Sequence, residues 1–227
     1  MPRRTIIPLG DRALTIEFPD AEETPRDLLR CLTAALRLRP LPAVTGLVPA
    51  IRTLTVHYDP ARTTFDALER TLSDVLATLV VTPETEREPV PIPVCYGGEF
   101  GPDLAVVANT HRTSIEAVIA AHTAGRYRVA MLGFLPGFPY LEGLDPSLHT
   151  PRRASPRTSV PAGSVGIGGS STGVYPFTSP GGWQLIGRTP ITLFAPERTP
   201  PSLLGPGDLV RFVAISAEEY LERMARA

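Results

Sequence analysis

Apolar residues recur with helical spacing in four stretches that contain no proline: residues 26–39, 61–82, 103–135 and 207–227. Proline disrupts a helix interior, so these stretches are where we expect helices. The clearest apolar stripes are Leu28, Leu29, Leu32, Ala35 and Leu36 in the first stretch, and Phe65, Leu68, Leu72, Val75, Leu76 and Leu79 in the second. Steps of three and four residues place each set on one helix face.

Capping signals mark where three of these helices begin. A hydroxyl residue followed three positions later by an acidic one occurs at Thr63–Asp66, Thr113–Glu116 and Ser216–Glu219. Such a side chain accepts a hydrogen bond from a backbone N–H of the first helical turn. Gly125 is a typical stop signal for the helix that follows Thr113.

Strand-like segments fill the intervals of the first 80 residues. Ile6–Leu9 and Ala13–Phe18 flank the turn dipeptide Gly10-Asp11, and Gly46–Val48 and Ile51–Tyr58 follow the first helix. The order strand, strand, helix, strand, strand, helix predicts a two-layer α+β domain with its helices on one sheet face.

The second half of the chain differs in composition, because it is rich in glycine. Thirteen of the 19 glycines lie between residues 133 and 207, among short β-rich segments such as Val165–Ile167, Gly173–Phe177, Trp183–Ile186 and Leu209–Val213. Short strands between frequent turns are typical of a barrel or a sandwich. The proline-rich segment Pro83–Pro93 is expected to be a linker into an edge strand. We therefore predict two domains, residues 1–85 and 86–227.

Composition narrows the possible functions. The 227 residues carry 22 basic and 23 acidic side chains, for a net charge of −1, and every basic residue is arginine. The absence of lysine excludes Schiff-base chemistry and a lysine-containing phosphate loop. A net charge close to zero gives no indication that the protein binds nucleic acid or an anionic membrane surface. With no apolar run of about 20 residues and no signal-peptide pattern, we expect a cytoplasmic protein.

Residues 146–196 contain no Asp or Glu, although about a tenth of the chain is acidic. The side chains there that can bind an anion are Arg152, Arg153, Arg157, Arg188, Ser170, Ser171 and Thr172. Arginine presents a planar donor fork to carboxylate or phosphate, and glycine turns let backbone N–H groups approach. We predict an anion-binding surface that lacks a carboxylate base of its own. The alternative is a basic face that pairs with acidic residues of the other domain.

Histidines and aromatic residues supply further candidates. The four histidines show no metal-ligand spacing, so we expect no metal site in this chain. His149, inside the acid-free window, is a candidate proton carrier or a plain loop residue. The candidate walls of a small-molecule pocket are Phe134, Phe138, Tyr140, Tyr175 and Trp183. The same aromatic residues could instead anchor a protein partner or pack in the core.

Several motifs occur together in a fixed order: Tyr96-Gly-Gly-Glu-Phe-Gly-Pro-Asp103, Gly133-Phe-Leu-Pro-Gly-Phe-Pro-Tyr-Leu141, Pro151-Arg-Arg-Ala-Ser-Pro-Arg157, Val160-Pro-Ala-Gly-Ser-Val-Gly-Ile-Gly-Gly169, Thr172-Gly-Val-Tyr-Pro176, Ser179-Pro-Gly-Gly-Trp-Gln-Leu-Ile-Gly-Arg-Thr-Pro190 and Pro206-Gly-Asp-Leu-Val-Arg-Phe212. Over nearly the whole chain they resemble the B subunit of bacterial ATP-dependent 5-oxoprolinase, a family also called allophanate hydrolase subunit 1 or sensor-kinase inhibitor KipI. One position departs: Ser171 stands where the family usually has glutamine.

The resemblance implies a ferredoxin-like N-terminal domain and a cyclophilin-like β-barrel C-terminal domain. It implies a heteromer with the 5-oxoprolinase C subunit (KipA, allophanate hydrolase subunit 2-like) and a functional partner, the LamB/YcsF-like 5-oxoprolinase A subunit. Together they open 5-oxo-L-proline to L-glutamate at the expense of ATP. Phosphorylating the lactam oxygen would create a good leaving group for hydrolysis. ATP with Mg²⁺ would bind at a site shared with the C subunit, and the arginines would hold the anionic groups.

The same resemblance leaves other functions open. The chain could be a regulatory inhibitor of a sensor histidine kinase, or a carboxyltransferase or allophanate hydrolase-type subunit of urea metabolism. Because no lysine is present, any biotin carrier would be another chain. An interface protein that merely stabilises its partner is the remaining alternative.

Overall fold

A computed structural model describes residues 4–18, 26–82 and 88–226. The chain divides into two compact units, residues 1–86 and 87–227, and each unit has its own hydrophobic core. None of the helices in the described ranges is both long and apolar enough to cross a lipid bilayer.

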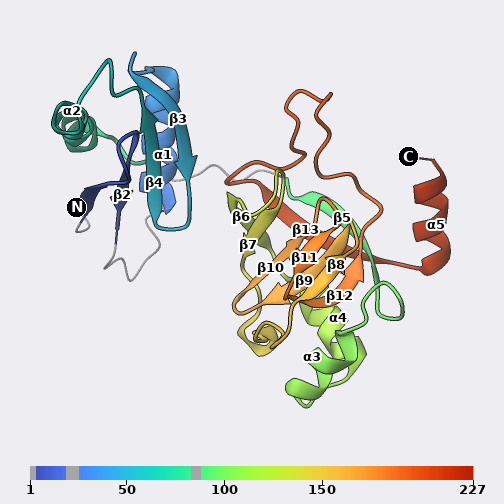
Figure 1. Cartoon of the computed structure of the whole chain (residues 1–227). Coiled ribbons are helices and arrows are strands. Elements are labelled where there is room, and N and C mark those ends of the chain that lie inside the picture. The colour runs from blue at the N-terminus through green and yellow to red at the C-terminus, as the bar shows by residue number, and fades with distance from the viewer. Residues whose placement is uncertain (1–3, 19–25, 83–87, 227) are drawn as a thin grey trace. The chain divides into compact units, whose positions relative to one another are not determined.

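The first unit is a four-stranded antiparallel sheet with two helices (Figure 1). Its elements are β1 (Thr5–Pro8), β2 (Ala13–Glu17), α1 (Arg26–Leu38), β3 (Val44–Pro49), β4 (Thr53–Tyr58) and α2 (Phe65–Thr78). The strand order is β1-β2-β4-β3, so α1 connects two strands, β2 and β3, that have β4 between them.

Both helices of this unit cover the same face of the sheet. Leu14 pairs with Val56 and Ile16 with Leu54, so these four side chains point to one face. All four are fully buried, and they form one cluster with the apolar stripes of α1 and α2. The two-layer arrangement predicted from the order of strands and helices is therefore present.

Helix caps explain where the later helices start. The hydroxyls of Thr64, Ser114 and Ser216 each accept a hydrogen bond from the backbone N–H three residues later. The prediction is confirmed at Ser216 but is wrong by one residue at Thr63 and Thr113. At both places two hydroxyl residues are adjacent in sequence, and the second of them is the cap.

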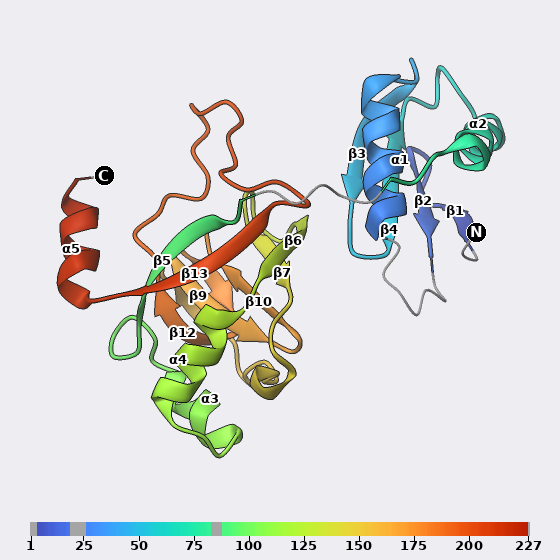
Figure 2. The same cartoon turned by 180° about the vertical axis from the view of Figure 1, so that it is seen from behind.

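The second unit is built around a closed barrel of seven strands in the order β10-β7-β6-β13-β5-β12-β9 (Figure 2). Its elements are β5 (Val90–Tyr96), α3 (Leu104–Thr110), α4 (Ile115–Ala124), β6 (Tyr127–Leu132), β7 (Pro139–Glu142), β8 (Arg157–Val160), β9 (Ser164–Gly168), β10 (Ser171–Val174), β11 (Ser179–Gly181), β12 (Gln184–Arg188), β13 (Leu209–Ile215) and α5 (Ala217–Ala225). Strands β8 and β11 form a separate two-stranded ribbon.

The prediction that an edge strand follows the linker is wrong. Strand β5 lies between β13 and β12 in the closed barrel. It pairs in parallel with β13 from Val90 to Cys95. On its other side, β12 pairs only with Cys95 and Tyr96. Strand β5 can therefore contain Pro91 and Pro93, which have no N–H, without losing ladder hydrogen bonds to β12.

Candidate functional site

Asp103 is the point at which two of the candidate arginines meet. Its Oδ1 accepts hydrogen bonds from Nη1 of Arg153 at 3.1 Å and from Nη2 of Arg157 at 2.7 Å. Its Oδ2 accepts from the backbone N–H of Leu185 at 2.7 Å. The Asp103 side chain is only 4% exposed, whereas those of Arg153 and Arg157 are 35% and 23% exposed. A buried carboxylate thus holds two cations that still reach solvent.

The loop after β5 carries Asp103 to this position by pairing with β12. The N–H of Asp103 donates to the carbonyl of Leu185 at 2.8 Å, and the N–H of Gly97 donates to Ile186 at 3.1 Å. The contact requires glycine at position 101, because a Cβ there would lie 2.0 Å from the carbonyl oxygen of Ile186. The loop therefore replaces part of the ladder that β5 leaves open.

This arrangement corrects the expectation that the arginine-rich surface has no carboxylate of its own. Asp103 belongs to the same unit as the arginines, although it lies outside the acid-free window. Two of the four arginines, Arg153 and Arg157, thus have a carboxylate partner within their own unit. Sequence reasoning missed Asp103 because its proximity to Arg157 depends on tertiary structure. The one available signal was its place at the end of the Tyr96–Asp103 motif.

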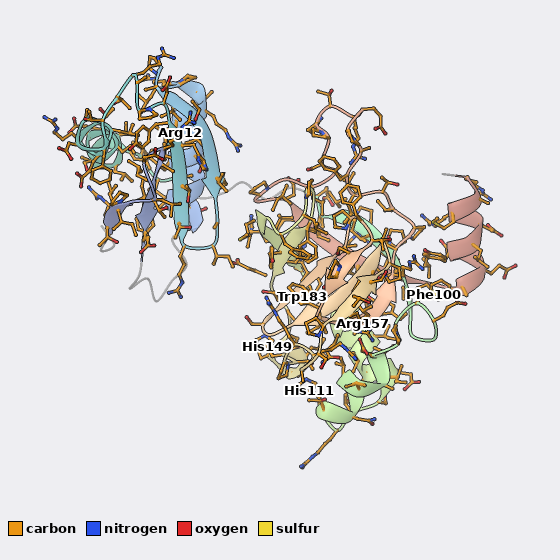
Figure 3. The ribbon with its side chains drawn as sticks, in the orientation of Figure 1. Arg12, Phe100, His111, His149, Arg157 and Trp183 are labelled. Carbon is orange, nitrogen blue, oxygen red and sulfur yellow. The ribbon has the colours of Figure 1, made fainter. Side chains whose placement is uncertain are left out.

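Arg152 joins the same neighbourhood through the aromatic residues. Its guanidinium carbon lies 5.9 Å from the centre of the Trp183 ring, a distance at which a cation is attracted to the ring face. Burial raises the pKa of the Tyr175 hydroxyl, and the positive charges of Arg152 and Arg157 oppose that rise. Figure 3 labels both Arg157 and Trp183 in the second unit.

The five predicted aromatic residues form one packed cluster. The ring of Phe138 lies 5.0 Å from Tyr140, 5.1 Å from Tyr175, 5.5 Å from Trp183 and 5.6 Å from Phe134. Phe138, Tyr175 and Trp183 are buried, but Phe134 is 60% exposed. Phe134 also has a φ of 68°, a conformation that costs a residue with a Cβ about 1–2 kcal/mol.

Three glycines, Gly166 and Gly168 on β9 and Gly173 on β10, lie against Trp183. A Cβ at position 168 would lie 2.6 Å from the indole ring, and one at position 166 or 173 would lie 3.1 Å from Trp183 atoms. Only glycine, which has no Cβ, leaves space for the indole ring at position 168.

Thr172 has a structural role instead of a place beside the arginines. It is fully buried, its hydroxyl donates to the carbonyl of Gly166 at 3.0 Å, and it lies 3.1 Å from Nε2 of His122. His122 is itself fully buried, and this burial lowers its pKa to about 3. We therefore leave Thr172 out of the anion site. Ser170 is exposed and Ser171 is half-buried at the start of β10.

Arg188 and His149 each bind a backbone carbonyl. The Nε of Arg188, at the end of β12, donates to the carbonyl of Ala162 at 2.9 Å. The Nε2 of His149 lies 3.2 Å from the carbonyl of Leu144 and must donate to it, because a carbonyl only accepts. Neither side chain is joined to the Asp103 group by these contacts. Within the described ranges, no three His, Cys, Asp or Glu side chains gather where they could hold a metal ion.

Comparison with known proteins identifies a family to which this chain is similar. The profile of the family described as "Carboxyltransferase domain, subdomain C and D" matches residues 4–204. The chain is 45% identical over 229 residues to the 5-oxoprolinase B subunit of Bacillus subtilis, covering 96% of this chain and 95% of that protein. It is 47% identical over 206 residues to the 5-oxoprolinase B subunit of Escherichia coli O157:H7, covering 90% and 93%.

Among solved structures, TTHA0988 superposes with a TM-score of 0.78 at 39% identity. The match covers 91% of this chain but only 40% of TTHA0988. In that protein the shared fold is therefore one part of a longer polypeptide.

Proposed function

The chain belongs to the family of carboxyltransferase domains, subdomains C and D, and we propose that it is the B subunit of an ATP-dependent 5-oxoprolinase. The observation that carries this proposal is the near full-length match, in both directions, to two 5-oxoprolinase B subunits at 45% and 47% identity. A match of this extent involves both units of the chain rather than a shared module.

The arginine group around Asp103 supports the proposal chemically. Both 5-oxo-L-proline, through its carboxylate, and ATP, through its phosphates, present anionic oxygens. Arg153 and Arg157 are oriented by Asp103 and partly exposed, and Arg152 lies over Trp183. Guanidinium groups held in this way can bind and orient an anion with little further loss of side-chain entropy.

The rest of the reaction is proposed to depend on other chains. We propose a cytoplasmic heteromer with the 5-oxoprolinase C subunit, a functional partner in the LamB/YcsF-like A subunit, and ATP with Mg²⁺ bound at a site shared with the C subunit. The arginine fork is a suitable partner for phosphate or carboxylate oxygens. In this complex the chain would bind and position anions, and the partners would contribute the acids and bases of the reaction.

Co-expression with the C subunit, followed by an ATPase assay, tests the proposal. We expect ATP hydrolysis that depends on added 5-oxo-L-proline, and formation of L-glutamate when the A subunit is supplied. ATP turnover that is unchanged by 5-oxo-L-proline, in a complex that assembles normally, would contradict the proposed substrate.

A second function is favoured by one observation, the description of the family as carboxyltransferase domains. In that case the chain would transfer a carboxyl group delivered by a biotin carrier on another polypeptide. The same co-expressed complex distinguishes the two functions. Turnover that requires bicarbonate and a biotinylated carrier, and not 5-oxo-L-proline, would favour carboxyl transfer.

We also propose the finer fold names that the family resemblance implies. The β2-α1-β3 connection across β4 is a split βαβ unit, which supports a ferredoxin-like description of the first unit. The closed seven-stranded barrel supports a cyclophilin-like description of the second. A structural superposition of each unit alone on members of these two folds would test the names.

A further inference from the structure

Hydrogen bonding around Asp103 is incomplete. The buried Nε of Arg153 and the buried Nη1 of Arg157 have no hydrogen-bond partner among the described residues. The same is true of Oε1 of Gln184, a residue only 7% exposed. The Nε2 of Gln184 donates to the carbonyl of Pro151 at 3.0 Å, which fixes the orientation of the amide. Unsatisfied buried polar atoms are rare in folded proteins and often mark places where a ligand binds.

The positive charges of this group of arginines are not balanced either. Within the described ranges, Asp103 is the one carboxylate that pairs with Arg153 and Arg157, and both guanidiniums share its Oδ1. Arg152 adds a third positive charge close to Tyr175. Three cations and one buried anion leave an excess of two positive charges, which one or two added negative charges would offset.

We infer that this cluster binds the carboxylate of 5-oxo-L-proline rather than the phosphates of ATP, an inference that rests on the proposed function. Each arginine uses only one side of its fork to bind Asp103, so Nη1 of Arg157 and Nε of Arg153 remain to donate to a second carboxylate. Both side chains are also partly exposed, so a ligand in solvent can approach the cluster.

Asp103 also gives the cluster its selectivity. A monocarboxylate lowers the excess positive charge and leaves Asp103 paired. A triphosphate carries about four negative charges and would be repelled by the Asp103 carboxylate, which the Leu185 N–H holds in place at 2.7 Å. The C subunit would then have to supply most of the contacts to ATP.

Steady-state kinetics of the assembled complex tests this inference. For Arg157→Gln we expect the KM for 5-oxo-L-proline to rise about 10- to 100-fold, the usual effect of losing a charge-assisted hydrogen bond, while the KM for ATP stays within about twofold. Arg153→Gln should change the same parameter in the same direction. Arg211→Gln, which removes an exposed arginine from β13, is the matched control and should change neither KM.

A rise in the KM for ATP, with the KM for 5-oxo-L-proline unchanged, would overturn the inference. If a variant does not fold, direct binding to the wild-type complex decides. Calorimetric titration should detect 5-oxo-L-proline but not 2-pyrrolidinone, the same ring without the carboxylate, and a saturating concentration of ATP should not compete. Competition by ATP, or equal binding of 2-pyrrolidinone, would contradict the carboxylate assignment.

The failure of the inference can be distinguished from failure of the proposed function. If the wild-type complex shows no turnover that depends on 5-oxo-L-proline, the proposed function fails. If that turnover is present but the arginine variants retain wild-type KM values for 5-oxo-L-proline, only the assignment of the carboxylate to this cluster fails.

Discussion

The hydroxyl of Thr172 accepts a hydrogen bond from Nε2 of His122. It must accept, because its own proton is donated to the carbonyl oxygen of Gly166. His122 therefore carries its proton on Nε2, and its Nδ1 accepts from the hydroxyl of Tyr96 at 2.8 Å. The imidazole also stacks on Phe212, with ring centres 4.4 Å apart. Both nitrogens of this buried ring therefore have a hydrogen-bond partner in the neutral form.

The buried His122 should make the second unit sensitive to acid. Its pKa is about 3 in the folded protein and about 6.5 in an unfolded chain. Between these values the unfolded state binds more protons, so the free energy of unfolding falls as the pH falls below about 6.5. The slope from this group approaches about 1.4 kcal/mol per pH unit.

Urea unfolding followed by the fluorescence of Trp183, the single tryptophan of the chain, measures this slope at several pH values. His122→Gln removes the titrating group and should flatten the dependence between pH 6.5 and 4. An identical pH dependence in the wild type and the variant would show that His122 is not its source.

Removal of the Thr172 hydroxyl should destabilise the barrel. Thr172→Val leaves Nε2 of His122 and the carbonyl of Gly166 without their shared partner, which we expect to cost about 1–3 kcal/mol. Thr172→Ser is the control, since it keeps the hydroxyl and loses one methyl group, worth about 1 kcal/mol. Chemical denaturation compares the two, and a smaller loss for valine than for serine would contradict the bonding described.

Truncation of Asp103 should be more damaging than neutralisation. Asp103→Ala leaves two arginines and the Leu185 N–H without their common acceptor, and we expect a loss of about 2–4 kcal/mol because the arginines are partly hydrated. Asp103→Asn retains an acceptor for Leu185 and should lose less. Thermal unfolding ranks the two variants. Equal stabilities of both variants and the wild type would mean that the ion group does not hold the loop after β5.

A methyl group at position 168 should displace Trp183. In Gly168→Ala the new Cβ would lie 2.6 Å from the indole ring, so we expect a red-shifted emission maximum and a loss of about 1–3 kcal/mol from overpacking. Gly182→Ala is a suitable control, because its Cβ would meet only Pro156 at an ordinary 3.6 Å. An unshifted emission spectrum in Gly168→Ala would contradict the packing of the ring on β9.

Much of the helical structure could be predicted from the sequence, because helices depend on local patterns. The proline-free stretches 26–39 and 61–82 contain α1 and α2 with the expected buried stripes. The stretch 103–135 was expected to hold one helix that stops at Gly125, and that helix is α4. The short helix α3, which precedes it, was not predicted.

Contacts that close over long distances could not be predicted in the same way. Strand β5 contains Pro91 and Pro93, which locally favour an edge, yet its position in the barrel depends on β13 more than 100 residues later. Similarly, the arginines were correctly singled out as an unusual group, but nothing local shows that Asp103 lies between Arg153 and Arg157. The aromatic residues and the arginines come together only because the strands that carry them are neighbours in the fold.

Closure of the barrel by β13 has a consequence for how the protein is made. The ribosome synthesises β5 first and β13 last among the barrel strands, and the two lie side by side in parallel. A nascent second unit therefore keeps an open sheet edge until β13 has emerged, while the described strands and helices of the first unit are complete by residue 78. During translation we expect the second unit, rather than the first, to need chaperones, because unpaired sheet edges favour aggregation.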